Sequence, residues 1–421
     1  MPTTPDDDEL ELIRRSGVVL RVGRLSLSAG TGSYRVKASM LRVAHALGID
    51  RHEAHVTLTE ITTTSHRGPS FRTEVAEVRT IGVNVDRLAG LEHLAGRLDA
   101  AGQATVEDVT AELDRIAAKP PLYPVVLNAL WAALACAAFS FLNSGGVVEV
   151  VGVFVGAFLG QALRRSMLHR GFNQFGVTML SATVACLAYV GLVGLLQATG
   201  ATGGGHEAGY ISAVLFLIPG FPLVTGFLDL AKLDFSAGVA RLAYALMILT
   251  SAALAVWALS LVVGLSPDPA PRTALDPGLL LTLRFVASFL GVLGFALMFN
   301  SPWRIALAAA VIGMVANVPR IALVEGGVPP QAAAATAALV VGLLAAVVAP
   351  RLDVPRITVY VPAVTIMVPG VLAYRAVFHI SNGETVEALS SGVQAALVVA
   401  ALAIGLAIAR MLTDRTWAYE R

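Results

Sequence analysis

Apolar stretches long enough to cross a lipid bilayer follow one another from Pro124 to the end of the chain, and this feature limits the possible folds more than any other. A transmembrane helix needs about 20 mainly apolar residues. Such stretches lie at about 124–142, 147–163, 174–197, 209–231, 238–264, 279–300, 303–323, 331–349, 357–378 and 389–412. They predict a mainly α-helical membrane protein with about ten transmembrane helices, in contact with the lipid bilayer.

Charged residues concentrate before the first apolar stretch. Residues 1–119 hold 15 of the 30 Lys and Arg residues and 17 of the 29 Asp and Glu residues, a charged fraction typical of a soluble domain. We therefore predict a soluble α/β domain over 1–119, a first membrane repeat over 120–264, a linker over 265–278, and a second repeat with a short tail over 279–421. The net charge of +1 argues against nucleic acid as a partner.

The soluble domain shows two kinds of periodicity. Helical spacing predicts helices over 10–28, 33–47, 85–100 and 105–117, and β-branched alternation predicts strands over 55–62 and 71–79. The glycine-rich stretch at 30–35, which precedes a helix, is interpreted as a loop, with an anion site at the helix N-terminus as the alternative.

The soluble domain lacks the motifs that would indicate chemistry. Its clustered histidines, His45, His52, His55 and His66, do not have the ligand spacing of a zinc site. A nucleophile elbow and a phosphate-binding loop are also missing from the sequence. We predict no metal, no cofactor and no catalytic residue, and hence no enzyme.

The placement of Lys and Arg in short loops predicts the orientation of the chain, because cytoplasmic loops carry the excess of these residues. With a cytoplasmic N-terminal domain, the residues on the cytoplasmic side are Arg164, Arg165, Arg170, Lys232, Arg304, Arg351, Arg356, Arg410, Arg415 and Arg421. The opposite side holds Arg272, Arg284, Arg320 and Arg375. This bias predicts that both termini are cytoplasmic and that the number of spans is even.

Three short motifs recur in the same order in the two halves of the membrane region. The pairs are Phe141-Leu-Asn-Ser144 with Phe299-Asn-Ser301, Ile218-Pro-Gly220 with Val368-Pro-Gly370, and Ser236-Ala-Gly238 with Ser390-Ser-Gly392. Each half holds five spans, so the second half enters the membrane in the opposite sense. The sequence therefore predicts two inverted five-helix repeats, as in many secondary transporters.

The proline–glycine pairs predict where a substrate binds. Proline cannot donate a backbone N–H, and carbonyls freed in a membrane must face protein, water or a ligand. Half-helix ends at such breaks can hold the carboxylate and the ammonium of an amino acid. We predict a substrate site formed by Pro219, Gly220, Pro222, Thr225, Asp229, Arg241, Asn300, Pro369, Gly370 and Tyr374. The alternatives are plain kinks at the breaks and interface anchors at Asp229 and Arg241.

Several of these motifs together resemble the bacterial threonine/serine exporters. They are Ser28-Ala-Gly-Thr-Gly-Ser-Tyr-Arg35, Leu217-Ile-Pro-Gly-Phe-Pro222, Asp229, Ser236-Ala-Gly-Val-Ala-Arg241, Gly294-Phe-Ala-Leu-Met-Phe-Asn300, and Val368-Pro-Gly370 with Tyr374-Arg375. The resemblance covers both halves and the soluble domain. It implies a secondary exporter of threonine and serine in the cytoplasmic membrane, driven by the proton motive force.

Other functions stay open from the sequence alone. Val371 follows Pro369-Gly370 where the family motif has a more polar residue, so another small metabolite such as a dicarboxylate is an alternative substrate. A membrane-anchored enzyme and a sensor, each with the soluble domain as the active part, are alternatives of a different class. Assembly into a homo-oligomer is also left open.

Overall fold

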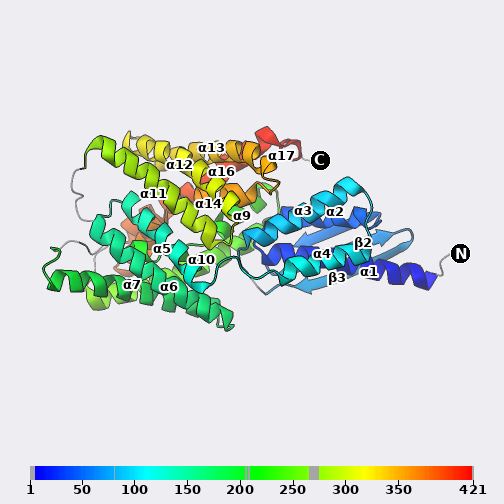
Figure 1. Cartoon of the computed structure of the whole chain (residues 1–421), viewed down its shortest axis with the longest axis horizontal. Coiled ribbons are helices and arrows are strands. Elements are labelled where there is room, and N and C mark those ends of the chain that lie inside the picture. The colour runs from blue at the N-terminus through cyan, green and yellow to red at the C-terminus, as the bar shows by residue number, and fades with distance from the viewer. Residues whose placement is uncertain (1–4, 80, 204–205, 207–208, 265–274, 420–421) are drawn as a thin grey trace. The chain divides into compact units, whose positions relative to one another are not determined.

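The computed structural model describes residues 5–79, 81–203, 206, 209–264 and 275–419, and it is mainly helical (Figure 1). The chain forms two compact units. The first, here called the α/β unit, comprises Met1–Leu122, Thr225–Leu242 and Ala349–Thr358; the second, the helical unit, comprises Tyr123–Val224, Ala243–Val348 and Val359–Arg421. The predicted domain boundaries stay a prediction, and most of the predicted linker, 265–274, lies outside the described residues.

The α/β unit begins with two helices, followed by a small antiparallel sheet and two more helices. These elements are α1 (Pro5–Ser28), α2 (Ser33–Ala46), β1 (Arg51–Val56), β2 (Glu60–Arg67), β3 (Ser70–Glu77), α3 (Val85–Ala101) and α4 (Val106–Ala118). The strand order is β1-β2-β3. The side chain of Thr105 accepts a hydrogen bond from the Asp108 backbone amide at 3.1 Å and so caps the N-terminus of α4.

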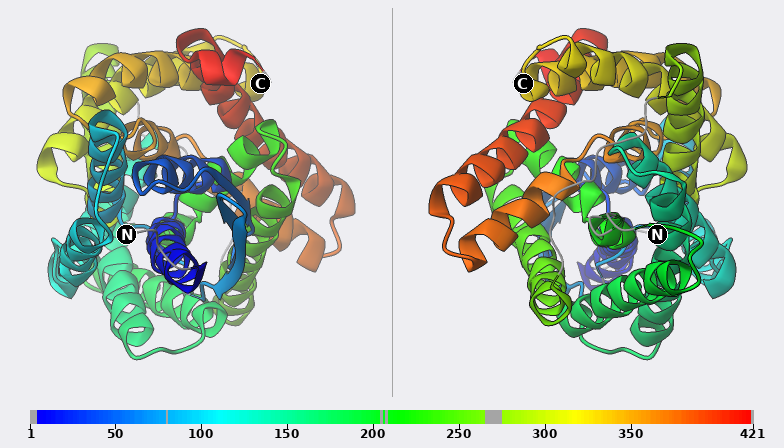
Figure 2. Two further views of the ribbon diagram at one scale, coloured as in Figure 1. Left: turned by 90° about the vertical axis from the view of Figure 1, so that its right-hand side faces the viewer. Right: turned by 90° about the vertical axis from the view of Figure 1, so that its left-hand side faces the viewer.

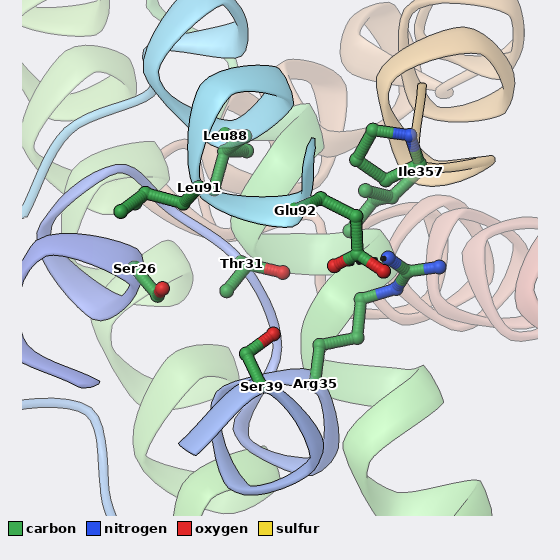
Figure 3. Close-up of a pocket in the computed structure, with 9 residues that line it drawn as sticks. Ser26, Thr31, Arg35, Ser39, Leu88, Leu91, Glu92 and Ile357 are labelled. Atoms are coloured by element: carbon green, nitrogen blue, oxygen red, sulfur yellow. Dashed lines mark ion pairs between the residues drawn. The ribbon is translucent and has the colours of Figure 1, made fainter. Parts of the chain in front are cut away.

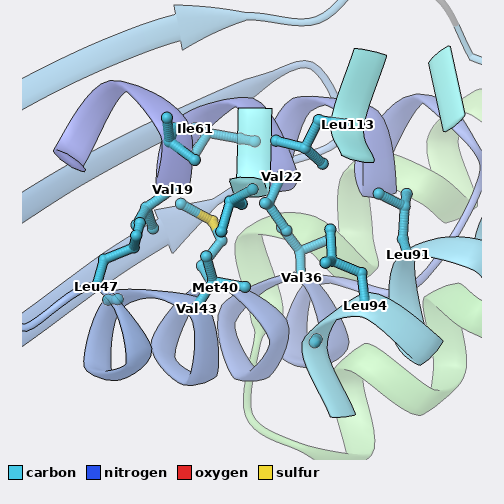
Figure 4. Packing of buried hydrophobic residues seen from close by; sticks show 14 of the residues in the cluster. Val19, Val22, Val36, Met40, Val43, Leu47, Ile61, Leu91, Leu94 and Leu113 are labelled. Carbon is cyan, nitrogen blue, oxygen red and sulfur yellow. The ribbon is translucent and has the colours of Figure 1, made fainter. Parts of the chain in front are cut away.

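Apolar residues at helical spacing form the core of the α/β unit (Figure 4). Val36, Met40 and Val43 lie on one face of α2 and are fully buried. They pack in one cluster with Val19 of α1 and Ile61 of β2. Full burial of such side chains stabilises a fold by about 1.5–3 kcal/mol each, so this cluster is what holds the helices to the sheet.

The prediction of a single strand over 55–62 is wrong. The structure instead has β1 and β2 joined by a tight turn at 57–59, and β1 extends back to Arg51. The Thr57 amide donates to the Glu60 carbonyl, and the Thr57 hydroxyl accepts from the Glu60 amide at 3.0 Å. Alternation of apolar and polar residues continues through this turn, so the pattern concealed the break.

The other elements of the described residues are helices, most of them long. They are α5 (Val125–Leu142), α6 (Val147–His169), α7 (Gln174–Ala198), α8 (Gly209–Ala213), η1 (Leu215–Leu217), α9 (Gly220–Ala231), α10 (Phe235–Val263), α11 (Pro277–Met298), α12 (Trp303–Glu325), α13 (Pro330–Arg351), α14 (Ile357–Thr365), α15 (Gly370–Ser381), α16 (Thr385–Thr413) and α17 (Arg415–Ala418). Eight of the described helices are long and apolar enough to cross a membrane. Two further pairs, 209–217 with 220–231 and 357–365 with 370–381, reach that length together but bend by 59° and 51° at their breaks.

Small residues let the helices of the helical unit approach closely. A Cβ atom on Gly156 of α6 would lie 2.5 Å from the Ala185 carbonyl of α7, and one on Gly294 of α11 would lie 2.6 Å from the Trp131 carbonyl of α5. Figure 2 shows α6 and α7 side by side. Such close backbone packing is a main source of helix association in membranes, where lipid is as apolar as the side chains.

Buried polar side chains in the helical unit are joined across helices. The Asn128 amide of α5 donates to the Met298 carbonyl of α11 at 2.9 Å, and Gln161 of α6 donates to Asn128 at 2.8 Å. Asn317 of α12 donates to Ser288 of α11 at 2.9 Å. These polar groups therefore serve helix packing.

Candidate functional site

The two broken helices touch one another at their breaks. A Cβ atom on Gly220, the first residue of α9, would lie 3.1 Å from Cγ2 of Thr365 at the end of α14. A Cβ atom on Gly370, the first residue of α15, would lie 2.0 Å from Cδ1 of Ile218. Each glycine thus contacts the segment that precedes the other break. Only glycine fits there without displacing a neighbour.

The same backbone hydrogen bond is made at both breaks. The Gly220 amide donates to the Ile218 carbonyl at 2.8 Å, and the Gly370 amide donates to the Val368 carbonyl at 2.9 Å. Each bond closes a three-residue turn with a proline at its centre. Pro369 has φ −81° and ψ 62°, the dihedral angles of an inverse γ-turn. Proline suits this position because its ring fixes φ and because the turn needs no N–H from its central residue.

The helix after each break starts from the carbonyl of the proline. Leu223 donates to the Pro219 carbonyl at 3.0 Å, and Ala373 donates to the Pro369 carbonyl at 3.1 Å. Pro222 lies in the first turn of α9, where a missing N–H costs no intrahelical bond. The first turns of α9 and α15 carry the positive ends of two helix dipoles, which favour negative charge.

Tyrosine hydroxyls from both halves of the helical unit meet near these elements. Tyr210 of α8 and Tyr374 of α15 lie 3.0 Å apart at their oxygens, with their rings edge to face. Both are buried, with 0% and 5% of their surface exposed. Tyr374 was among the predicted site residues, and Tyr210 was missed. A tyrosine within an apolar stretch close to a proline–glycine pair was the signal that could have indicated it.

Asn300, another predicted site residue of the helical unit, is also buried. Asn300 is 5% exposed and has a left-handed backbone, with φ 62°. It follows Phe299, whose ring packs edge to face on Phe221 in the first turn of α9 at 5.8 Å. The structure therefore links the α11–α12 turn to the start of α9.

Asp229 and Arg241 pair with one another, and both belong to the α/β unit, as does the buried Thr225. The Arg241 Nε atom lies 2.9 Å from Asp229 Oδ2, and the two residues are 2% and 0% exposed. Arg241 also donates through Nη2 to the Thr31 carbonyl at 2.7 Å. The Asp229 carboxylate faces the backbone amides of Ser33 and Tyr34 at the start of α2. The glycine-rich stretch before α2 thus holds an anion, and that anion is a side chain of the same protein.

The histidines of the α/β unit do not gather into a metal site. Across the described residues, the structure contains no group of three His, Cys, Asp or Glu side chains able to hold a metal ion. His52 is buried on β1 with its Nδ1 atom 2.9 Å from the Ser65 hydroxyl. Burial, together with the nearby His45, lowers the pKa of His52 from 6.5 to about 4.

Two family models match most of the chain. Residues 17–263 match the family described as "Putative threonine/serine exporter", and residues 284–412 match the family described as "Threonine/Serine exporter, ThrE". The chain belongs to the threonine/serine exporter family. With eight to ten candidate spans among its described residues, this member of the family is a multi-pass membrane protein.

Named relatives of this family member fall into two groups. The "Probable threonine/serine exporter" of Mycobacterium tuberculosis is 26% identical and the "Threonine/serine exporter" of Corynebacterium glutamicum is 24% identical; the matches cover 97% and 98% of this chain and 78% and 86% of those proteins. The "Probable succinate transporter subunit YjjP" of Klebsiella aerogenes is 26% identical over 55% of this chain and 86% of its own length. No solved structure matches the chain.

Proposed function

We propose that this protein is a secondary exporter of threonine and serine across the bacterial cytoplasmic membrane, driven by the proton motive force. The observation that carries the proposal is the contact between two proline–glycine turns closed by the same hydrogen bond, at Gly220 and at Gly370, in a member of an exporter family. Paired helix breaks are the usual place for substrate in transporters built from repeats. In this proposal the α/β domain carries no catalytic chemistry.

The two breaks offer complementary groups for a zwitterionic amino acid. The amides in the first turns of α9 and α15 attract its carboxylate. Carbonyls released before Pro219 and Pro369 accept hydrogen bonds from its ammonium group. The hydroxyls of Tyr374 and Tyr210 suit a hydroxyl-bearing side chain. We propose that the substrate-binding residues are Pro219, Gly220, Pro222, Thr225, Asn300, Pro369, Gly370 and Tyr374.

Equal helix lengths support two inverted repeats. α9 and α15 each have 12 residues, α10 and α16 each have 29, and α6 and α12 each have 23. Each half then holds five spans if each bent pair counts as one. Together with the excess of Lys and Arg in alternate loops, this arrangement supports cytoplasmic N- and C-termini.

Succinate export is the second candidate function, because the Klebsiella aerogenes relative is named a succinate transporter subunit. A dicarboxylate has two anionic groups and no ammonium. The two helix N-termini of α9 and α15 could attract both anions, whereas the released carbonyls would have no donor to accept from. Direct competition between the two substrates distinguishes these functions.

Proteoliposomes that contain the purified full chain test the proposal. We expect labelled threonine to cross the membrane at least tenfold faster with an imposed pH gradient than after the gradient is collapsed, and unlabelled serine to compete. Vesicles without protein are the control. Competition by succinate but not by serine would favour dicarboxylate export. Equal rates of threonine transport with and without the pH gradient would exclude proton coupling.

A further inference from the structure

The turn between α9 and α10 contacts the glycine-rich stretch at residues 30–35. This stretch belongs to the N-terminal α/β domain, predicted over residues 1–119, which is one part of the α/β unit. Arg241 donates to the Thr31 carbonyl, and the Asp229 carboxylate faces the backbone amides at the start of α2. A Cβ atom on Gly32 would lie 2.7 Å from Asp229 Oδ1, so the absence of a side chain there permits the contact. Asp229 and Arg241 thus pair with one another and lie against the loop at residues 30–35.

A second ion pair holds the same turn. Lys37, one turn into α2, pairs with Asp234, which directly precedes α10. The turn itself is fixed by a hydrogen bond of 2.9 Å from the Asp234 amide to the Asp229 carbonyl and by the left-handed backbone of Leu233, with φ 60°. The α/β domain therefore contacts the turn at both of its ends, at Asp229 in α9 and at Asp234 before α10.

The α/β domain also holds the segment that leads into α14. His93 of α3 lies 2.7 Å from Asp353 through Nδ1 and Oδ2. Arg35 and Glu92 point toward one another 3.8 Å apart in a small cavity that Pro355 and Ile357 also line (Figure 3). This cavity measures about 10 Å³, room for a single water molecule. The domain and this segment are therefore closely packed.

Both gripped segments continue directly into the broken helices. Residues 225–231 are the C-terminal part of α9, which begins at the Gly220 break, and Ile357–Thr358 begin α14, which ends at Thr365 before the other break. An α-helix rises about 1.5 Å per residue, so Asp229 lies about 14 Å from Gly220 along the axis of α9. Because a helix is stiff, a rotation of α9 at Asp229 also rotates its first turn at Gly220.

We propose that Asp229 and Arg241 are positioning residues: they fasten the end of α9 to the loop at residues 30–35, so that the α/β domain sets the geometry of the break at Gly220. The inference rests on the proposed export function. It gives the pair a role different from contact with the transported molecule. It also makes the α/β domain part of the transport mechanism without requiring it to bind a ligand.

Cross-linking provides a readout that does not depend on transport. A carbodiimide activates the Asp234 carboxylate, the Lys37 amine displaces the resulting urea, and an amide bond forms between the two side chains. Mass spectrometry of the full chain in detergent should detect this cross-linked peptide. We expect Gly32→Val to lower its yield at least fivefold. Gly96→Val is the matched control, because a side chain at Gly96 of α3 meets nothing within 4 Å.

Threonine efflux in proteoliposomes provides the functional readout. We expect Gly32→Val and Asp229→Asn each to lower the maximal efflux rate at least fivefold, with KM unchanged within twofold. The variant that combines Gly32→Val with Asp229→Asn should be no slower than either single variant. Lys37→Glu should lower the efflux rate, and Lys37→Glu with Asp234→Lys should restore it. This pair of variants tests the contact if Gly32→Val fails to fold.

Parental efflux in Gly32→Val with the cross-link lost would overturn the inference. A raised KM in Asp229→Asn with the cross-link intact would instead place Asp229 at the substrate. Absence of threonine and serine efflux from the parent protein would refute the proposed function alone, since the cross-link still reports the grip.

Discussion

A single buried histidine should make the stability of the α/β domain depend on pH. The pKa of His52 falls from 6.5 to about 4 in the folded protein because the imidazole is buried beside His45. Between these two values the unfolded chain binds a proton that the folded domain excludes. The free energy of unfolding of the domain is therefore highest above pH 6.5. It falls by up to about 3 kcal/mol as the pH falls toward 4.

Hydrogen exchange of peptides covering residues 51–67 in the full chain measures this effect. Protection should fall between pH 7.5 and pH 5, after correction for the intrinsic exchange rate. His52→Leu should lower protection at pH 7.5 by about 1 kcal/mol, because Ser65 loses its partner, and should remove most of the additional loss at pH 5. His55→Leu on the exposed face of the same strand is the control. An unchanged pH response in His52→Leu would show that another group titrates.

At the level of elements, the proline–glycine turns make the sharpest prediction about export. A leucine at Gly370 would overlap Ile218 and Leu215, and one at Gly220 would press on Thr365. Overpacking of this kind costs about 1–3 kcal/mol and shifts the backbone. We expect Gly220→Leu and Gly370→Leu each to lower threonine efflux at least tenfold while insertion into the membrane is retained.

Gly191→Leu on α7 is the matched control for these two variants. A side chain at Gly191 meets nothing within 4 Å, so the substitution adds the same bulk without a clash. It should export at the parental rate. Parental rates in Gly220→Leu and Gly370→Leu, measured with equal amounts of inserted protein, would show that the breaks are only kinks and that the substrate binds elsewhere.

The long apolar elements were readable from the sequence, whereas one short polar element was not. The predicted starts at 124, 147 and 174 lie within one residue of α5, α6 and α7, because length and hydropathy fix such helices. β1 escaped detection because Thr57 closes a turn without glycine or proline. The proline–glycine breaks were visible since a missing N–H is a property of the residue itself.

The contact between Asp229 and the glycine-rich loop could not be predicted. The Arg241–Thr31 bond joins residues 210 positions apart, and no periodicity connects them. The sequence did suggest each side of the contact separately: site residues at Asp229 and Arg241, and, as an alternative, an anion site before α2. Their combination required the tertiary fold, because the anion belongs to the chain rather than to a ligand.

At the scale of the whole molecule, the orientation of the chain in the membrane is testable by labelling. The native Cys136 and Cys186 are buried and should react little. In intact cells, a membrane-impermeant thiol reagent should label Ala201→Cys after α7, and should label His169→Cys at the end of α6 only after permeabilisation. Both positions are exposed in the structure. The opposite pattern would place the N-terminal domain outside and contradict the assignment of every loop.

The interface between α5 and α11 has a consequence for how the genes of such proteins can be arranged. Tyr123 donates to the Ser301 carbonyl at 2.8 Å, Asn128 donates to the Met298 carbonyl, and Gly294 fits against the α5 backbone. These bonds form between helices already inserted in lipid, so they need no continuous backbone between α10 and α11. Two separately translated polypeptides can therefore meet along this interface. A gene can be divided there, or two genes fused, with these three contacts retained.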